Sequence, residues 1–380
     1  MTSKLPLKAD HVGSFLRTDP VKQARASYAN GEINRAALRE VEDQEIEKLV
    51  KKQIDVGLKA ITDGDFRRSF WHLDFFVSLK GIEKVEIDRG LQFADGIEVR
   101  RVSYEIKDKI EFDENNALIN DFLYLNDLVK KYGDGTQVAK VTIPAPGVIF
   151  YRNVTEDEKK VYADARALFR DLGKAYREVI RQLYNAGCRY IQFDETTLTT
   201  FADENFVSLM TGITDLSKEE VLQLIIDATN YALEDKPADL LVSVHMCRGN
   251  FKSKHIHADG GYDYVAPSFD KLKYDAFFLE YDNERSGDFK PLENIQRRNA
   301  EVVLGVFTSK FPELEDEDVI NRRIKEASQY IPLENIALSP QCGFASTEEG
   351  NILTEEEQWN KVKHIIQIAE NVWDKASIDK

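Results

Sequence analysis

A histidine and a cysteine stand two positions apart in the sequence, inside the stretch SVHMCRGN that continues an apolar run. These residues, His245 and Cys247, are notable in a chain with only three cysteines and six histidines. Residues i and i+2 of a strand point to the same side, with their Cα atoms about 7 Å apart. The pair can therefore converge on one metal ion, and an imidazole with a thiolate favours zinc over magnesium or calcium.

Two further residues of the types that bind zinc stand at the ends of other apolar runs. Glu280 ends the run DAFFLE, and Cys342 follows NIALSPQ. With His245 and Cys247 they supply two thiolates, an imidazole and a carboxylate, which is a plausible zinc donor set. Each residue also has a structural explanation, because buried cysteine behaves as a small hydrophobe. In the same way, Cys342 could belong to a turn, and Glu280 could pair with a nearby arginine.

The remaining cysteine and histidines have less specific surroundings. Cys188 follows a helical stretch, and we expect it to be structural. His255 and His257 form an H-x-H pair in a polar stretch that we expect to be a mobile loop, so they are weaker metal candidates. We expect a structural role for the two other histidines discussed, His72 and His364.

Short β-rich runs alternate with helical patterns along the chain. Helices are expected at 218–235, 316–331 and 354–373, and the last two begin with acidic residues that suit a helix N-terminus. Eight strands alternating with helices predict an α/β fold, a (β/α)8 TIM barrel. A doubly wound open sheet is the alternative, disfavoured by the strand count and by the lack of a glycine-rich dinucleotide loop. The expected strands are 8–14, 58–65, 138–145, 188–195, 239–247, 275–282, 301–309 and 335–342.

One connection of this barrel is too long to be a simple loop and helix. Residues 81–137 separate the second and third expected strands, and residues 97–112 alternate as a hairpin does. We therefore expect a β-hairpin insertion after the second strand. The chain of 380 residues has the length of two average domains or one large barrel, and it has no linker rich in Gly, Pro or Ser. A single catalytic domain over residues 1–380 is the expectation.

Polar side chains gather at the carboxyl ends of the expected strands. Side chains alternate between the two faces of a strand, and this period places Asp194, His245 and Cys247 on polar faces. Ser14 and Asp65 also end expected strands. Polar groups in strands buried on both faces need a reason, and barrel enzymes build their active sites at this end. The pattern therefore predicts one active-site rim.

The composition narrows the classes of partner. A net charge of −16 would repel polyanions, so we expect small-molecule substrates, without nucleic acid or an anionic membrane as partner. No apolar run reaches about 18 residues, the length that suggests a membrane span. The first residues lack the apolar core of a signal peptide, and three cysteines do not make a disulfide framework. We expect a cytoplasmic protein.

Six motifs, in this order, resemble the catalytic barrel of cobalamin-independent methionine synthase: HVGSFLRT, DGDFRR, IQFDE, HMCRGN, FLEYDNERSGDF and SPQCGF. The resemblance covers nearly the whole chain and is close to the short, single-barrel members of that superfamily. It implies a Zn²⁺ site made by His245, Cys247, Glu280 and Cys342. Glu284 competes for the carboxylate role because the segment EYDNERS is longer than in the long enzymes. Glu280 is preferred because it directly ends an apolar strand.

The same resemblance implies a homocysteine site. The turn at Val12, Gly13 and Ser14 would hold the carboxylate of homocysteine, and Asp65 and Asp194 would hold its ammonium group. The long enzymes have a glutamate at the position of Asp65, so the carboxylate here is one methylene shorter.

Two departures from the family pattern concern the methyl donor. The long enzyme has a histidine proton donor after the seventh strand, where this chain places Lys310 in GVFTSKFPELED. Lys310 is therefore the candidate catalytic acid, provided that its pKa is depressed. The folate-stacking tryptophan after the third strand is replaced by the proline-containing segment VTIPAPGVIFYRN.

The resemblance implies zinc-dependent methyl transfer from 5-methyltetrahydrofolate, with or without a polyglutamate tail, to homocysteine, which yields methionine. One alternative keeps the zinc thiolate but takes the alkyl group from a methylated partner protein or an epoxide. The related epoxyalkane:coenzyme M transferases share a similar opening stretch. A metal-free barrel acting as a lyase or a binding protein is the second alternative. Homo-oligomers are compatible with each of these.

Overall fold

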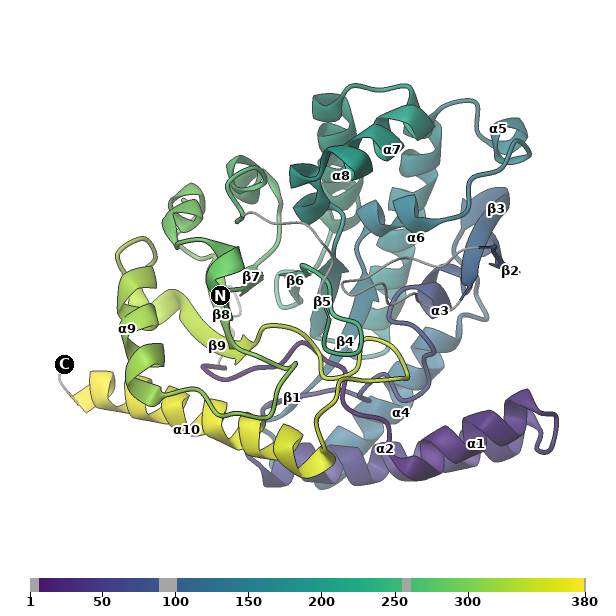
Figure 1. Ribbon diagram of the computed structural model, residues 1–380. Coiled ribbons are helices and arrows are strands. Elements are labelled where there is room, and N and C mark those ends of the chain that lie inside the picture. The colour runs from purple at the N-terminus through teal and green to yellow at the C-terminus, as the bar shows by residue number, and fades with distance from the viewer. Residues whose placement is uncertain (1–6, 89–100, 255–260, 379–380) are drawn as a thin grey trace.

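The computed structural model describes residues 7–88, 101–254 and 261–378, and its centre is a parallel sheet of seven strands (Figure 1). The strands follow the order β1-β4-β5-β6-β7-β8-β9, and each neighbouring pair is parallel. Parallel strands place all their carboxyl ends at one edge, so the polar strand ends of the sequence share that edge. The strands are β1 (Ala60–Ile61), β4 (Val138–Pro144), β5 (Tyr190–Glu195), β6 (Leu241–Met246), β7 (Ala276–Glu280), β8 (Glu301–Phe307) and β9 (Ile336–Pro340).

The N-terminal segment joins the two edges of this sheet. Ala9 pairs with Leu338 of β9, and Ser14 pairs with Gly64 just after β1, each as an isolated parallel bridge. This segment is predicted from the sequence as a full first strand, but it contributes only these bridges. The φ of Gly13, 132°, interrupts its extended conformation. The barrel expectation is therefore confirmed in part, as a curled, parallel seven-stranded sheet with helices.

Helices flank the sheet, and several begin at side chains that accept a hydrogen bond from the first turn. Ser217 and Glu220 form a reciprocal capping box at the start of α8. The expected helices at 218–235, 316–331 and 354–373 are present as α8, α9 and α10. The helices are α1 (Asp19–Ala29), α2 (Arg35–Asp55), α3 (Leu73–Phe76), α4 (Ala117–Tyr132), α5 (Glu158–Val161), α6 (Ala165–Asn185), α7 (Glu204–Thr214), α8 (Lys218–Leu233), α9 (Glu317–Ala327) and α10 (Glu355–Ile378).

Short 3₁₀ helices occupy several of the loops that connect the strands and helices. They are η2 (Pro146–Tyr151), η3 (Leu198–Ala202), η4 (Ala266–Lys271), η5 (Glu284–Ser286), η6 (Lys290–Asn294) and η7 (Leu333–Asn335). In the described ranges, no helix combines the length and apolar composition that a membrane span needs.

A two-stranded antiparallel ribbon lies beside the main sheet, next to α3 (Figure 1). It pairs β2 (Lys80–Glu86) with β3 (Val102–Glu111). The ribbon lies in the region of the insertion expected after the second strand, at about residues 81–137, but the described part of the alternating stretch 97–112 contributes only one of its strands, β3. A bulge at the start of β2 requires Gly81, because its φ is 82° and a Cβ would lie 2.4 Å from the carbonyl oxygen of Lys109. The helix α4 falls inside the expected insertion, yet it packs on α2 and β4.

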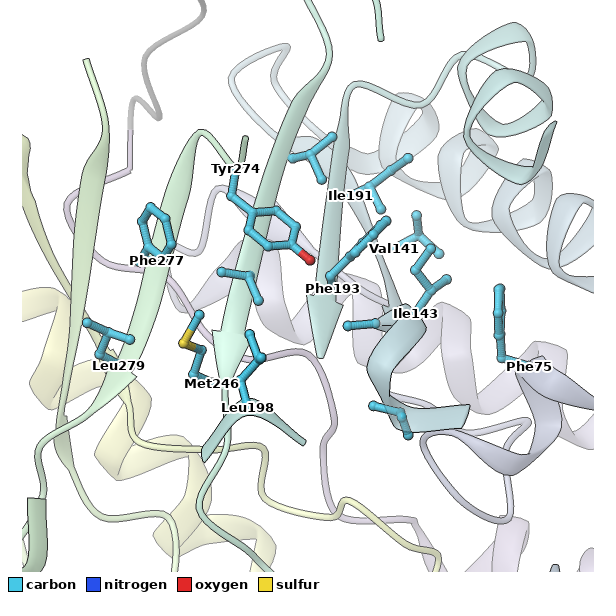
Figure 2. Packing of buried hydrophobic residues seen from close by; sticks show 14 of the residues in the cluster. Phe75, Val141, Ile143, Ile191, Phe193, Leu198, Met246, Tyr274, Phe277 and Leu279 are labelled. Carbon is cyan, nitrogen blue, oxygen red and sulfur yellow. The ribbon is translucent and has the colours of Figure 1, made fainter. Parts of the chain in front are cut away.

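Strand alternation sorts the buried side chains into two layers. Phe193, Met246 and Leu279 belong to the outer layer, where Figure 2 shows them packed with other apolar side chains. Each such side chain contributes about 1.5–3 kcal/mol through burial. Tyr190 and Phe278 point to the opposite side and form a separate inner cluster. The inner positions further along the same strands carry the polar residues of the site.

Candidate active site

The four candidate metal ligands come together at the carboxyl ends of three strands. His245 lies on β6 with Cys247 just after it, Glu280 ends β7, and Cys342 follows β9. Their ligand atoms all lie within 4.8 Å of one another, and all four residues are buried. The two Sγ atoms are 3.7 Å apart, and His245 Nε2 lies 3.7 Å from Glu280 Oε1. The structure therefore brings the sequence-predicted quartet into one cluster.

Hydrogen bonds orient this cluster from outside. Asp194 Oδ1 lies 3.3 Å from His245 Nδ1, and the carbonyl oxygen of Gln341 lies 2.9 Å from Nε2. Glu280 Oε1 accepts a bond from the backbone N–H of Arg248 at 3.0 Å. A carboxylate at one ring nitrogen fixes the imidazole and directs its other nitrogen, as in many zinc sites. Asp194 is thus placed to orient His245.

Proton affinities within the cluster are strongly coupled. Burial opposes a charge on His245, but its hydrogen bond to Asp194 and the charge of Cys342 raise its pKa to about 10. The hydrogen bond with Cys247 lowers the pKa of Cys342 to about 7, while burial opposes this. The same hydrogen bond, followed by burial, raises the pKa of Cys247 well above its usual value. Without a metal ion, the chain therefore favours one thiolate over two.

The donor set fits zinc. Glu280 Oε2 is buried and has no hydrogen-bond partner in the described part of the chain, so one carboxylate oxygen is left for another ligand. Two thiols, an imidazole and a carboxylate match the ligand types of protein zinc sites. Glu284, the competing carboxylate, is exposed on η5 and lies outside the cluster. Geometry therefore favours Glu280, as the position of this residue at a strand end suggests.

The N-terminal turn lies beside Cys342. A Cβ on Gly343 would lie 1.9 Å from Ser14 Oγ, so this glycine allows the turn to approach. Ser14 Oγ accepts a bond from the backbone N–H of Ala345 at 3.3 Å. Gly13 has a φ of 132°, and a Cβ there would meet Thr142 at 2.6 Å. The turn therefore depends on two glycines to lie against the metal cluster.

The two acidic residues predicted to hold an ammonium group both line the adjoining cavity. Asp65 Oδ1 lies 3.3 Å from Arg68 Nη1 and accepts a long hydrogen bond from Thr142 Oγ1 at 3.4 Å. Burial raises the pKa of Asp65, with Arg68 acting in the opposite direction. Gln192 Nε2 donates to Asp194 Oδ1 at 2.8 Å and to the carbonyl oxygen of Val12 at 2.7 Å. One amide therefore connects the turn with Asp194.

A cavity of about 340 Å³ opens over the cluster and the turn. His245, Cys247 and Cys342 line it, together with Val12 and Ser14. Its other walls are mostly aromatic and apolar and come from the loop after β1, from η2 and from the ribbon. They include Phe70, Trp71, His72, Val102, Phe150 and Tyr151.

The sequence does not predict that aromatic residues line this cavity. His72 was expected to be structural, yet it lines the cavity and packs against Trp71 and Tyr151, with ring centroids 4.7 and 6.0 Å away. A weak signal existed, since the stretch SFWHLDFF follows the strand that ends at Asp65. This loop is held over the strand ends by contacts with residues distant in the sequence, such as the bridge between Phe70 and Thr347. A local stretch of sequence does not predict such contacts.

Lys310, the predicted catalytic acid, is buried and is not among the residues that line the cavity. Its Nζ lies 4.0 Å from Asp282 Oδ2. Burial would raise the pKa of Glu280, but His245 and the ammonium of Lys310 lower it below its usual value. This placement makes Lys310 a neighbour of Glu280, and its catalytic role stays a prediction.

The other described candidates, Cys188 and His364, are not part of the metal cluster. Cys188 is buried and its Sγ bonds to the carbonyl oxygen of Tyr190 at 3.4 Å, while burial raises its pKa to about 12. His364 bonds through Nε2 to a backbone carbonyl at 2.7 Å. His255 and His257 lie outside the described residues.

The fold and the site define an α/β protein with a candidate metal centre at the carboxyl ends of parallel strands. Residues 129–371 match the family described as "Cobalamin-independent synthase, Catalytic domain". The uncharacterized protein YxjH of Bacillus subtilis (strain 168) is 43% identical over 372 residues, which cover 97% of this chain and 96% of that protein. The chain therefore belongs to the cobalamin-independent methionine synthase family, in its short form.

Two further relatives agree with this assignment. The solved structure described as a putative vitamin-B12 independent methionine synthase from Listeria monocytogenes has a TM-score of 0.77 and 38% identity, over 98% of this chain and 99% of that chain. The methionine synthase of Saccharolobus solfataricus is 25% identical over 351 residues, 90% of each chain.

Proposed function

We propose that the protein transfers a methyl group from 5-methyltetrahydrofolate, with or without a polyglutamate tail, to homocysteine, and that Zn²⁺ is its cofactor. The observation that carries this proposal is the cluster of four ligand atoms within 4.8 Å, directly beside the turn at Ser14. Membership of the methionine synthase family supports it. We also propose that the N-terminal segment completes an eight-stranded barrel in a single domain.

In this proposal each residue of the chain has a defined task. His245, Cys247, Glu280 and Cys342 would hold the zinc ion, which when bound lowers the pKa of a substrate thiol so that the sulfur reacts as a thiolate. The turn at Ser14 would bind the carboxylate of homocysteine through its backbone and hydroxyl groups. Asp65 and Asp194 would bind the ammonium group and so fix the distance between the sulfur and the methyl carbon.

The direct test supplies zinc-loaded protein with L-homocysteine and (6S)-5-methyltetrahydrofolate, as the monoglutamate and as the triglutamate. Methionine, measured by mass spectrometry, should form with at least one of them. The Glu280→Gln variant should lose this activity, whereas Glu284→Gln, a matched change on an exposed residue, should keep it. Absence of methionine with both folates would reject the proposed donor.

A second candidate function keeps the thiol half of the site and changes the alkyl donor. It is favoured by the position of Lys310 outside the cavity wall and by the lack of a tryptophan in the segment after β4. The donor would then be an epoxide or a methylated partner protein. A metal-free lyase is the third candidate, and one zinc ion per chain would exclude it. Cytoplasmic location, the absence of a nucleic-acid partner and any homo-oligomer stay predictions from the sequence.

A further inference from the structure

Arg17 is a buried arginine to which the proposed function gives no task. It closes the stretch HVGSFLR, three residues after Ser14, and it is only 3% exposed. Within the described part of the chain, all of its hydrogen bonds go to backbone carbonyl oxygens. Because burial of a charge is costly unless the group is well bonded, these carbonyl groups and the guanidinium hold each other in place.

The hydrogen bonds of Arg17 reach three segments that are distant in the sequence. Nη1 donates to the carbonyl oxygens of Phe15 at 3.1 Å, Gly64 at 3.2 Å and Ala345 at 2.9 Å. Nη2 donates to the carbonyl oxygen of Arg68 at 3.2 Å. Nη1 carries two hydrogens, so one of them is shared between two carbonyl groups, an arrangement that is common in proteins.

Each of these segments carries part of the proposed homocysteine site. The first carbonyl group directly follows Ser14, the second directly precedes Asp65, and the third lies three residues after Cys342. Arg17 itself is not among the residues that line the cavity. One guanidinium therefore joins the turn, the ammonium-binding loop and the metal segment from behind the cavity wall.

The loop at Asp65 shows why such a connection is needed. Asp65 has a φ of 60°, in the left-handed region that residues other than glycine rarely adopt, and such strain persists only where the surroundings impose it. Arg17 bonds to the carbonyl oxygen of the residue before Asp65 and to that of Arg68, three residues after it. The guanidinium thus holds both sides of the strained residue.

The chemistry of arginine suits this arrangement. A guanidinium directs its N–H groups along fixed directions in one plane, whereas a lysine ammonium is a compact charge that cannot reach carbonyl groups so far apart. Burial lowers the pKa of Arg17 to about 10, while Asp65 opposes this shift. The side chain therefore keeps its charge at neutral pH.

We propose that Arg17 is a positioning residue that fixes the turn at Ser14 and the loop at Asp65 relative to the metal cluster. One acceptor molecule can then bind through its carboxylate and its ammonium group while its sulfur reaches the metal. The inference rests on the proposed function and adds the residue that makes the site specific for an amino-acid thiol over a simple thiol.

The test measures the binding of two thiols to zinc-loaded protein by calorimetric titration. The ligands are L-homocysteine and n-propanethiol, which is the same thiol without the carboxylate and ammonium groups. The preference is the Kd of n-propanethiol divided by the Kd of L-homocysteine. Arg17→Lys and Arg17→Met should each reduce this preference about 10-fold, the effect of losing one hydrogen bond to a charged group.

This preference distinguishes positioning from general support of the fold. A partly unfolded variant loses affinity for both thiols by the same factor, which cancels in the ratio. Arg297→Met is the matched control, because Arg297 donates to the carbonyl oxygens of Leu272 at 2.8 Å and Tyr274 at 2.9 Å. These residues precede β7, whereas the candidate ligand Glu280 ends it. The control should keep the wild-type preference.

The outcomes separate this inference from the proposed function. If wild type prefers L-homocysteine and every folded Arg17 variant keeps that preference, the inference is wrong although the proposed acceptor stands. If neither Arg17 variant yields folded protein, Arg17 serves the fold and the inference is rejected. If wild type itself shows no preference, the proposed acceptor is wrong and the inference fails with it. The titration contains no methyl donor, so an error in the proposed donor does not affect this result.

Discussion

The sulfur atoms of Cys247 and Cys342 lie 3.7 Å apart and are buried. At this distance one thiol can donate a hydrogen bond to the other sulfur, which is then stabilised as a thiolate. The pKa of Cys342 falls to about 7 while that of Cys247 rises well above its usual value. A second negative charge at this distance needs a cation to offset the repulsion. The two cysteines therefore favour a divalent metal ion over two free thiols.

The first prediction concerns bound metal. Replacing either cysteine, as Cys247→Ser or Cys342→Ser, should reduce bound zinc from about one ion per chain to nearly none, because a thiolate ligand is lost. Metal analysis of protein purified with added zinc measures this. Cys188→Ser serves as the control, since Cys188 is buried and bonds to a backbone carbonyl elsewhere. Full zinc content in both cluster variants would contradict the quartet.

At the scale of the elements, the turn at Ser14 packs closely against the segment after β9. The contact leaves no room for a side chain at Gly343. Gly343 lies against Ser14, and its carbonyl oxygen accepts bonds from Asn250 Nδ2 at 2.8 Å and Ser309 Oγ at 3.0 Å. These bonds keep the segment from moving away. The position of the turn thus depends on a glycine beside a candidate ligand.

The second prediction is that Gly343→Ala will weaken homocysteine binding. Its methyl group would lie 1.9 Å from Ser14 Oγ, so the turn must shift, and overpacking of this kind costs about 1–3 kcal/mol. Gly212→Ala in α7 is the matched control, because nothing lies within 4 Å of the added carbon. Calorimetric titration with homocysteine and urea unfolding would compare them. Equal affinities in both variants would contradict the role of this contact.

The sequence predicts the metal cluster better than the cavity walls, for a physical reason. Glu280 interrupts an apolar strand, and a charge in a buried strand is a local signal of function. Trp71 and Tyr151 lie in loops, where aromatic residues carry no such signal, and their positions depend on contacts between distant segments. The first expected strand is present only as two isolated bridges, because alternation does not reveal the φ of Gly13. The alternating stretch 97–112 does not reveal the whole ribbon, because the partner of β3, the strand β2, lies outside that stretch.

At the scale of the whole molecule, buried neutral histidines make stability depend on pH. Burial, and after it the charge of Lys140, lowers the pKa of His11 to about 4, and burial lowers that of His72 to about 4. The unfolded chain protonates both below about pH 6.5, whereas the folded chain does not until about pH 4. The unfolded state then binds more protons, so stability is full above pH 6.5 and is lost as pH falls from 6.5 to 4.

The third prediction follows from this loss of stability at low pH. The free energy of unfolding, measured in urea at pH 7 and pH 5, should fall more in wild type than in His11→Asn. The difference should be about 1–2 kcal/mol, the linkage expected for one such group. The comparison uses the change with pH within each protein, so any general destabilisation by the substitution cancels. An equal change in both proteins would show that His11 does not titrate as its burial implies.

The fourth prediction concerns metal removal. A ligand that binds only the folded state raises the melting temperature, so a zinc chelator should lower it in zinc-loaded wild type. Cys247→Ser should melt at the same temperature with and without the chelator, whereas Cys188→Ser should respond as wild type does. Scanning calorimetry measures this effect, and a chelator response in Cys247→Ser would contradict it.

The N-terminal segment has a consequence for how the protein is made. Lys8 Nζ donates to the carbonyl oxygen of Glu334, 326 residues later in the chain, and Ala9 pairs with Leu338. During synthesis the segment that carries Ser14 leaves the ribosome long before its partners, since 326 residues separate Lys8 from Glu334. It must therefore wait, unpaired, while the intervening helices and strands fold, because contacts this distant in sequence form slowly. A chain stalled before β9 would carry three of the four candidate ligands but no completed pocket, so the full set of ligands exists only after the segment that carries Cys342 has been synthesised.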